Sequence, residues 1–187
     1  MAKLIYAMNV SLDGYMEDEH GSLEWSISDD EVFEFWTDFQ RSLDTYLYGH
    51  RFYESMVYWE TYDIHNDGQT GKTGEFAEIW RNAEKIVYSR SLQSVLSART
   101  ELRYEFDPDE VRNLKASLYK DISIGGAELA GHAMNQRLVD ECFLVVHPVI
   151  LGGGKRAFPD DLHVKLELLG ERRFKSGAVH LHYRVIR

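Results

Sequence analysis

Two glycine-containing turns in the sequence have the composition of a phosphate-binding site. Gly49 follows the apolar run Leu47-Tyr48, and Gly125-Gly126 follow a second apolar run. In both cases the next residues predict a helix, whose free N–H groups and partial positive charge attract anions. Glycine also lets a ligand approach the backbone closely. Close packing of a helix on a sheet explains each glycine as well, because neither turn completes a GxGxxG motif and no P-loop is present.

Ser89 and Arg90 form a third candidate phosphate contact, after another predicted strand. A hydroxyl and a guanidinium at a strand end suit a phosphate group. The alternative is that Ser89 caps a helix. Trp25, Trp36 and Phe39 could stack on a flat ring, although Trp36 and Phe39 also fall on an apolar stripe with helical spacing, which predicts packing in the core.

The composition excludes several classes of protein. The chain has 187 residues, of which 44% are hydrophobic and 28% charged, and we expect one domain over residues 1–187. Residues 1–60 hold 13 acidic and 3 basic side chains and carry the net charge of −10. A nucleic-acid partner is therefore disfavoured, because it needs a basic face. No apolar run is long enough for a membrane helix, and a secretory signal is not apparent, so we expect a cytoplasmic protein.

The chain contains one cysteine, Cys142, which lies in an apolar run. A single cysteine excludes an internal disulfide and every multi-cysteine zinc site. The apolar surroundings predict a buried, unreactive thiol. The histidines have no metal-like spacing, so we expect no metal site.

Predicted strands and helices alternate along the chain. Helix 30–42 can be capped by Ser28 or Asp29, and helix 107–118 begins with Asp107-Pro108, a favoured start. We expect loops at 60–75 and 152–159, and a β-hairpin in the tail around Lys175-Ser176-Gly177. The other expected strands are 3–10, 44–49, 85–89, one within 96–106, 121–126 and 141–151, and the other helices are 50–56, 76–83 and 127–138. This order predicts an α/β fold with a mostly parallel central sheet flanked by helices and a C-terminal antiparallel hairpin. In such a sheet, ligands bind at the carboxyl ends of the strands.

The order of the motifs along nearly the whole chain resembles the dihydrofolate reductase-like superfamily. Within that superfamily the sequence is most similar to the C-terminal reductase domain of the riboflavin-biosynthesis deaminase-reductases. The motifs that carry the resemblance are Ser11-Leu12-Asp13-Gly14, residues 47–54, 85–90, 124–126, 138–141 and 148–154, and Phe158-Pro159. The deaminase half is absent, because one cysteine cannot build its zinc site.

The resemblance implies an enzyme that transfers hydride from NADPH to a small heterocyclic substrate, similar to 5-amino-6-(5-phosphoribosylamino)uracil reductase. It also implies a homodimer. Two alternatives stay open: a dihydrofolate reductase, for which Glu31, Glu34 and Asp38 on the first helix are candidate pterin ligands, and a nucleotide-binding regulatory module without catalysis.

The resemblance further assigns roles to individual residues. Asp13 is the candidate catalytic group, with a turn-forming Asp before Gly14 as the alternative. The nicotinamide and substrate end would be lined by Asn9, Ser11 and Trp25. The implied cofactor contacts are Gly49, His50 and Arg51 at the phosphates, Ser89 and Arg90 at the adenosine 2′-phosphate, and Gly125, Gly126, Ala127 and Glu128 at the pyrophosphate.

The sequence departs from the family pattern at three positions. The family usually has Gly-Arg-x-Thr at the second turn, where this chain has His50 in place of the arginine and Phe52 in place of the threonine. The riboflavin enzymes commonly have a lysine four residues before the Ser of the SLDG motif, and this chain has Ala7 there.

Overall fold

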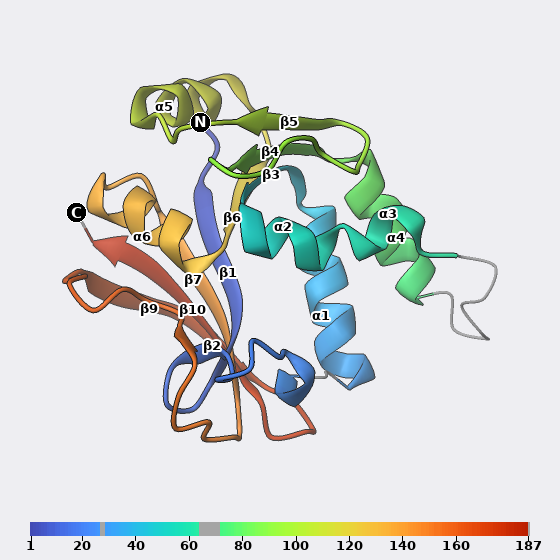
Figure 1. The fold of residues 1–187 in the computed structure, drawn as a ribbon. Coiled ribbons are helices and arrows are strands. Elements are labelled where there is room, and N and C mark those ends of the chain that lie inside the picture. The colour runs from blue at the N-terminus through green and yellow to red at the C-terminus, as the bar shows by residue number, and fades with distance from the viewer. Residues whose placement is uncertain (27–28, 64–71, 187) are drawn as a thin grey trace.

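A central eight-stranded sheet organises the computed structural model, which describes residues 1–26, 29–63 and 72–186 (Figure 1). The strand order is β5 (Thr100–Arg103), β4 (Glu84–Tyr88), β3 (Leu43–Gly49), β6 (Asp121–Gly125), β1 (Leu4–Ser11), β7 (Glu141–His147), β10 (Val179–Ile186) and β9 (Lys165–Arg173). The strands from β5 to β7 are parallel, and β10 runs antiparallel to both β7 and β9. The predicted α/β fold with a closing hairpin is confirmed.

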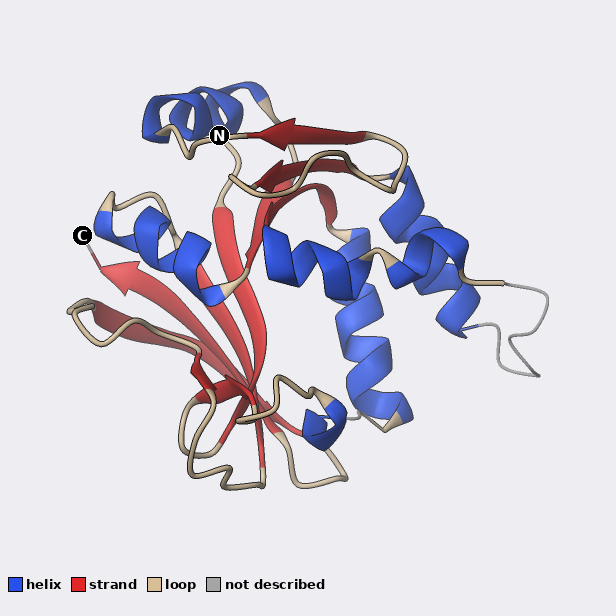
Figure 2. Ribbon diagram, in the orientation of Figure 1, coloured by secondary structure: helices blue, strands red, loops and turns tan. Residues whose placement is uncertain are grey.

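Helices cover both faces of this sheet (Figure 2). They are α1 (Asp30–Arg41), α2 (His50–Met56), α3 (Tyr58–Thr61), α4 (Lys72–Asn82), α5 (Pro108–Ser117) and α6 (Ala127–Asn135), with a 3-10 turn η1 (Glu24–Ser26) before α1. No described helix has both the length and the apolar character that crossing a membrane requires.

Strand β1 lies at the centre of the sheet and buries side chains on both faces. Leu4 and Tyr6 pack into the cluster that contains α5 and α6, whereas Ile5 packs with Phe39 of α1. A strand buried on both faces has a nearly continuous apolar sequence, which is why residues 3–10 are recognisable as a central parallel strand.

The structure shows which side chains cap the predicted starts of α1 and α5. Asp29 caps α1, because its Oδ1 accepts a hydrogen bond from the backbone N–H of Val32 at 2.9 Å. Ser28, the other candidate cap, lies outside the described residues. Asp107 caps α5 by accepting from the N–H of Asp109 at 2.9 Å, so the Asp-Pro start is confirmed.

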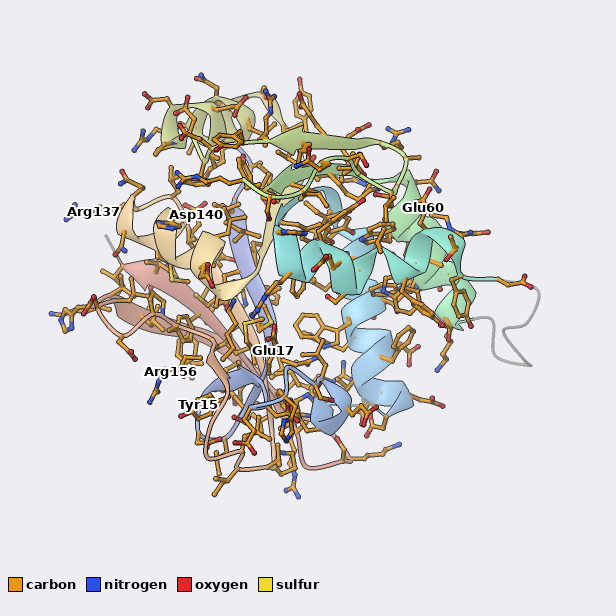
Figure 3. The ribbon with its side chains drawn as sticks, viewed as in Figure 1. Tyr15, Glu17, Glu60, Arg137, Asp140 and Arg156 are labelled. Carbon is orange, nitrogen blue, oxygen red and sulfur yellow. The ribbon has the colours of Figure 1, made fainter. Side chains whose placement is uncertain are left out.

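A short antiparallel ribbon beside the main sheet corrects the predicted loop at 152–159. Strand β2 (Tyr15–Glu17) pairs with β8 (Lys155–Arg156), and the Arg156 guanidinium lies 5.2 Å from the centre of the Tyr15 ring (Figure 3). Strands of two or three residues have no periodicity of their own, so only tertiary pairing defines them. The expected loop at 60–75 is also partly wrong: α3 and the start of α4 occupy its ends, and residues 64–71 lie outside the described part of the chain.

Candidate functional site

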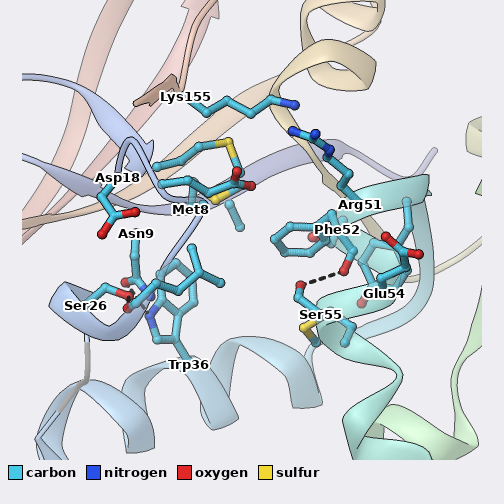
Figure 4. Close-up of a pocket in the computed structure, with 18 of the residues that line it drawn as sticks. Met8, Asn9, Asp18, Ser26, Trp36, Arg51, Phe52, Glu54, Ser55 and Lys155 are labelled. Atoms are coloured by element: carbon cyan, nitrogen blue, oxygen red, sulfur yellow. Dashed lines mark hydrogen bonds between the residues drawn. The ribbon is translucent and has the colours of Figure 1, made fainter. Parts of the chain in front are cut away.

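A cavity of about 1140 Å³ opens at the carboxyl end of the central strands (Figure 4). It exists because β6 pairs with β1 only as far as Tyr6, opposite Ile124, whereas β1 continues along β7 to Ser11. Ala7, Met8 and Asn9 therefore have an open side, and they line the cavity. This is the edge at which open α/β sheets bind their ligands.

One part of the cavity wall is aromatic and apolar. Helix α1 contributes Phe33, Trp36 and Phe39. The helices that follow β3 contribute Phe52, Met56, Trp59 and Phe76. Large flat side chains of this kind provide an apolar surface against which a ring can stack.

Charged side chains line another part of the wall. The acids are Glu17, Asp18, Glu19, Glu54 and Glu128, and the two cations are Arg51 and Lys155. Lys155 binds Glu128 at 2.9 Å, and this hydrogen bond is the main reason that the pKa of Glu128 is lowered. Arg51 makes no ion pair with a described residue, and its side chain points toward that of Lys155 (Figure 4). Arg51 is therefore the cation best placed to receive an anion from solution.

Asn9 belongs to a hydrogen-bonded group on the aromatic side. Its Oδ1 accepts from the indole N–H of Trp36 at 3.0 Å, and it lies 3.2 Å from Nε2 of His147. His147 is buried, and burial lowers the pKa of its imidazole. The rings of Trp25 and His147 are nearly perpendicular, at 89°, with 5.7 Å between their centres.

The cavity brings together only part of the residue set that the sequence singled out. Asn9, Arg51 and Glu128 line it. Trp25 does not, because its indole N–H donates to the carbonyl of Ser22 at 3.1 Å beside the cavity.

Asp13 and Ser11 do not line the cavity; Asp13 binds the loop after β7, and Ser11 binds Asp13. The Asp13 carboxylate accepts hydrogen bonds from the Ser11 hydroxyl at 2.7 Å and from the N–H groups of Leu151 and Gly152 at 3.1 and 2.8 Å. These donors, with the Ser11 hydroxyl first, lower the pKa of Asp13 to about 2. The bonds to Leu151 and Gly152 hold the turn after β1 against the loop after β7. The catalytic role of Asp13 stays a prediction.

The two predicted phosphate turns lie side by side. Tyr48 of β3 is in register with Gly125 of β6, and a Cβ on Gly126 would come within 3.6 Å of the Gly49 nitrogen. Gly126 has a φ of +99°, which favours glycine, and it caps α6 immediately before Ala127. A Cβ on Gly125 would overlap the ring of Phe52. Packing against Phe52 is therefore sufficient reason for Gly125.

The Ser89–Arg90 turn lies one strand further out. The Ser89 hydroxyl accepts from the N–H of Leu92 at 2.9 Å, and no helix follows it among residues 89–99, so the alternative of a helix cap is wrong. His50 connects this turn to α2, since its Nδ1 lies 3.1 Å from the Ser91 hydroxyl. Arg90 reaches Glu105 at 3.5 Å on the surface.

Several cavity residues were not predicted from the sequence. Lys155 follows Gly152-Gly153-Gly154, and a basic residue after a glycine-rich loop was an available signal. Phe33 and Trp59 carried no signal, because aromatic residues on helices usually indicate core packing. The sequence left open whether Trp36 and Phe39 stack on a ligand ring or pack in the core. Phe39 is buried, whereas Trp36 is only partly buried and binds Asn9.

Comparison with known proteins gives one family. The model of the RibD C-terminal domain matches residues 2–180. Protein YyaP of Bacillus subtilis (strain 168) is 35% identical over 187 residues, which cover 97% of this chain and 94% of YyaP.

Several solved structures share the fold. A putative riboflavin biosynthesis protein from Shewanella sp. PV-4 superposes with a TM-score of 0.77 at 18% identity, with both chains fully covered. The deaminase/5-amino-6-(5-phosphoribosylamino)uracil reductase of Thermotoga maritima gives 0.68 at 17% identity, with 99% of this chain and 57% of that chain covered. A dihydrofolate reductase from Enterococcus faecalis gives 0.64 at 12% identity, with 99% and 97% covered.

Proposed function

The chain belongs to the RibD C-terminal domain family, and from this membership we propose that it is an NADPH-dependent reductase of a small heterocyclic substrate. The observation that carries the proposal is the cavity at the carboxyl ends of β1, β3 and β6. It combines an aromatic wall, which suits a flat ring, with the cations Arg51 and Lys155, which suit phosphates.

The residues of the cavity fit the proposed cofactor. Arg51 and Lys155 would bind its phosphates, beside the free N–H groups at the start of α6. Trp36 and Phe52 would enclose the cofactor ring and the substrate ring between them and exclude water. When bound, the nicotinamide supplies the hydride; the chain's own task is to hold two rings in contact.

The first substrate to test is the one named for the Thermotoga maritima relative, 5-amino-6-(5-phosphoribosylamino)uracil. Dihydrofolate is less well supported, because α1 directs aromatic residues at the cavity and its acids bind elsewhere. Glu31 accepts from Arg172 at 3.1 Å, Glu34 lies 3.7 Å from Lys72, and Asp38 pairs with Arg41.

Calorimetric titration with NADPH and NADP⁺, followed by an absorbance assay of NADPH oxidation with each substrate, tests the proposal. We expect NADPH to bind and at least one heterocycle to be reduced. Binding without turnover of any heterocycle would favour the regulatory module, and no binding of NADPH at millimolar concentration would contradict the reductase. The implied homodimer and the single domain stay predictions, which light scattering and limited proteolysis would test.

A further inference from the structure

We propose that Asn9 determines the specificity of the cavity by donating a hydrogen bond, and that Trp36 and His147 are positioning residues that fix it in this role. The proposal rests on the proposed function in taking this cavity as the substrate site. It adds the chemistry of the group that is recognised: a carbonyl oxygen or an unprotonated ring nitrogen on a flat ring.

The indole of Trp36 fixes the orientation of the Asn9 amide. The Trp Nε1–H group is only a donor, so the atom that it contacts at 3.0 Å is the Asn9 oxygen rather than the nitrogen. The usual ambiguity of a side-chain amide is thereby removed. If the Asn9 amide rotated by half a turn, its nitrogen would replace the oxygen, and the indole N–H would lose its acceptor.

His147 occupies the other side of the same oxygen. Its Nε2 lies 3.2 Å from Asn9 Oδ1, and because that oxygen only accepts, Nε2 carries the hydrogen. Nε2 would carry a hydrogen in the protonated ring as well, so this contact does not depend on the charge of the imidazole. With two donors on Oδ1, the amide oxygen is saturated.

The amide nitrogen of Asn9 is left for a ligand. Asn9 lines the cavity, and its Nδ2 makes no hydrogen bond to any residue of the described chain. Asn9 and Trp36 lie together on one wall, across the cavity from Phe52 (Figure 4). A ring that stacks against this wall meets a donor and no free acceptor on Asn9. The geometry therefore selects for an acceptor on the ring.

The test uses two flat bicyclic probes without NADPH. Quinazoline-2,4-dione has carbonyl acceptors, and indole has an N–H donor but no acceptor. Dissociation constants are measured by NMR titration, following the indole N–H signal of Trp36, which is identified by its absence in Trp36→Phe. Asn9→Leu should weaken the dione about 3–10-fold, the usual effect of one neutral hydrogen bond, and leave indole unchanged. Asn9→Asp, which only accepts, should weaken the dione further and not weaken indole.

Positioning by His147 and Trp36 is tested with the same two probes, and calorimetric titration measures binding to Trp36→Phe, which lacks the indole N–H signal. His147→Phe and Trp36→Phe should each reduce the preference for the dione, and His147→Gln, which keeps a donor, should restore part of it. The matched control is Gln40→Leu, which removes another amide from the cavity wall. It should keep the wild-type preference.

The proposal is overturned if wild type does not bind the dione, if Asn9→Asp leaves its affinity unchanged, or if Gln40→Leu rather than Asn9→Leu removes the preference. The reductase proposal is judged separately by NADPH binding. If NADPH fails to bind while the preference for the dione depends on Asn9, the reductase is wrong and the role of Asn9 stands.

Discussion

The ring of Phe52 provides a packing reason for the glycine at position 125. Gly125 lies in a turn that suits phosphate, yet a side chain there would meet the Phe52 ring, so packing alone requires a glycine. Gly126 is different, because its φ of +99° favours glycine, whereas a Cβ there would reach only ordinary contact distance from Phe52 and Gly49. Packing against Phe52 thus accounts for Gly125, and backbone conformation accounts for Gly126, while their contact with the pyrophosphate stays a prediction.

The two predicted phosphate arginines should differ in which cofactor they affect. Arg51 lies in the cavity, so Arg51→Ala should weaken NADPH and NADH alike. Arg90 and its partner Glu105 are 73% and 69% exposed, so Arg90 can leave this weak pair for a 2′-phosphate. Arg90→Ala should therefore weaken NADPH about 10-fold, the lower end for a charge-assisted bond, and spare NADH.

Calorimetric titration of both cofactors measures this difference. Arg112→Ala, on α5 away from the cavity, removes the same charge and is the control. If Arg90→Ala behaves like Arg112→Ala, Arg90 does not bind the 2′-phosphate.

Asp13 should make stability depend on pH in the acidic range. Its pKa in the folded protein is about 2, below the ordinary value of 3.8, because the Ser11 hydroxyl and two backbone N–H groups bind the carboxylate. A lowered pKa means that the stabilisation is present above about pH 4 and is lost as the pH falls toward 2. Asp13→Asn should therefore lower the Tm at pH 7, and its difference from wild type should disappear near pH 2.

The same variant separates the two roles of Asp13. A Tm equal to that of wild type at pH 7, together with a loss of turnover, would support the catalytic role over the loop-holding one.

At the scale of elements, the sequence predicted long periodic segments and missed short ones. Strand β1 was recognisable by its nearly continuous apolar run, and helix α1 by its apolar stripe at helical spacing. The ribbon of β2 and β8 was not, because its few residues are held by pairing across about 140 positions of chain. Its loop also supplies Lys155 to the cavity, so part of the site was hidden with it.

Gly154 should control the position of this ribbon. It has a φ of +121°, and a Cβ there would overlap the carbonyl oxygen of Glu17. Gly154→Ala should separate β8 from β2, displace Lys155 and lower both the Tm and the affinity for NADPH. Gly153→Ala is the matched control, because nothing lies within 4 Å of its Cβ position and its φ is not positive. Equal Tm values for the two variants would show that the backbone at Gly154 adapts.

At the scale of the whole molecule, the two ends of the sheet carry different features. The cavity lies at the carboxyl ends of the parallel strands, and a group of buried charges lies at their amino ends, where Asp140 is seen far from Tyr15 and Glu17 (Figure 3). Alternation of strands and helices predicted which end would bind ligands. It could not predict the buried charges, because Lys and Glu in a sequence usually indicate solvent-exposed positions.

Ion pairs at the amino end, each with one buried partner, join α5 and the start of the chain to the sheet. Lys115 binds Asp140 at 2.6 Å, and the same carboxylate accepts from the N–H of Leu4 at 2.8 Å. Next to it, Glu141 binds Lys3 at 2.7 Å and His182 at 2.9 Å, which connects the start of the chain to β7 and β10.

Glu141→Gln should therefore destabilise the protein and leave the cavity intact. Burial raises the pKa of Glu141, but its hydrogen bonds to Lys3 and His182 outweigh this effect, so the pKa is lowered from the ordinary 4.5. The stabilisation is then present above about pH 4.5 and is lost as the pH falls below it. At pH 7, replacing the carboxylate by an amide should cost about 1.5–3 kcal/mol of the free energy of unfolding, the usual value of bonds to a charged group. Urea denaturation at pH 7 and pH 3 measures the loss, which should be smaller at pH 3, while the dissociation constant of NADPH at pH 7 should not change. A variant that unfolds like wild type but binds NADPH less well would show that the amino end of the sheet also serves the site.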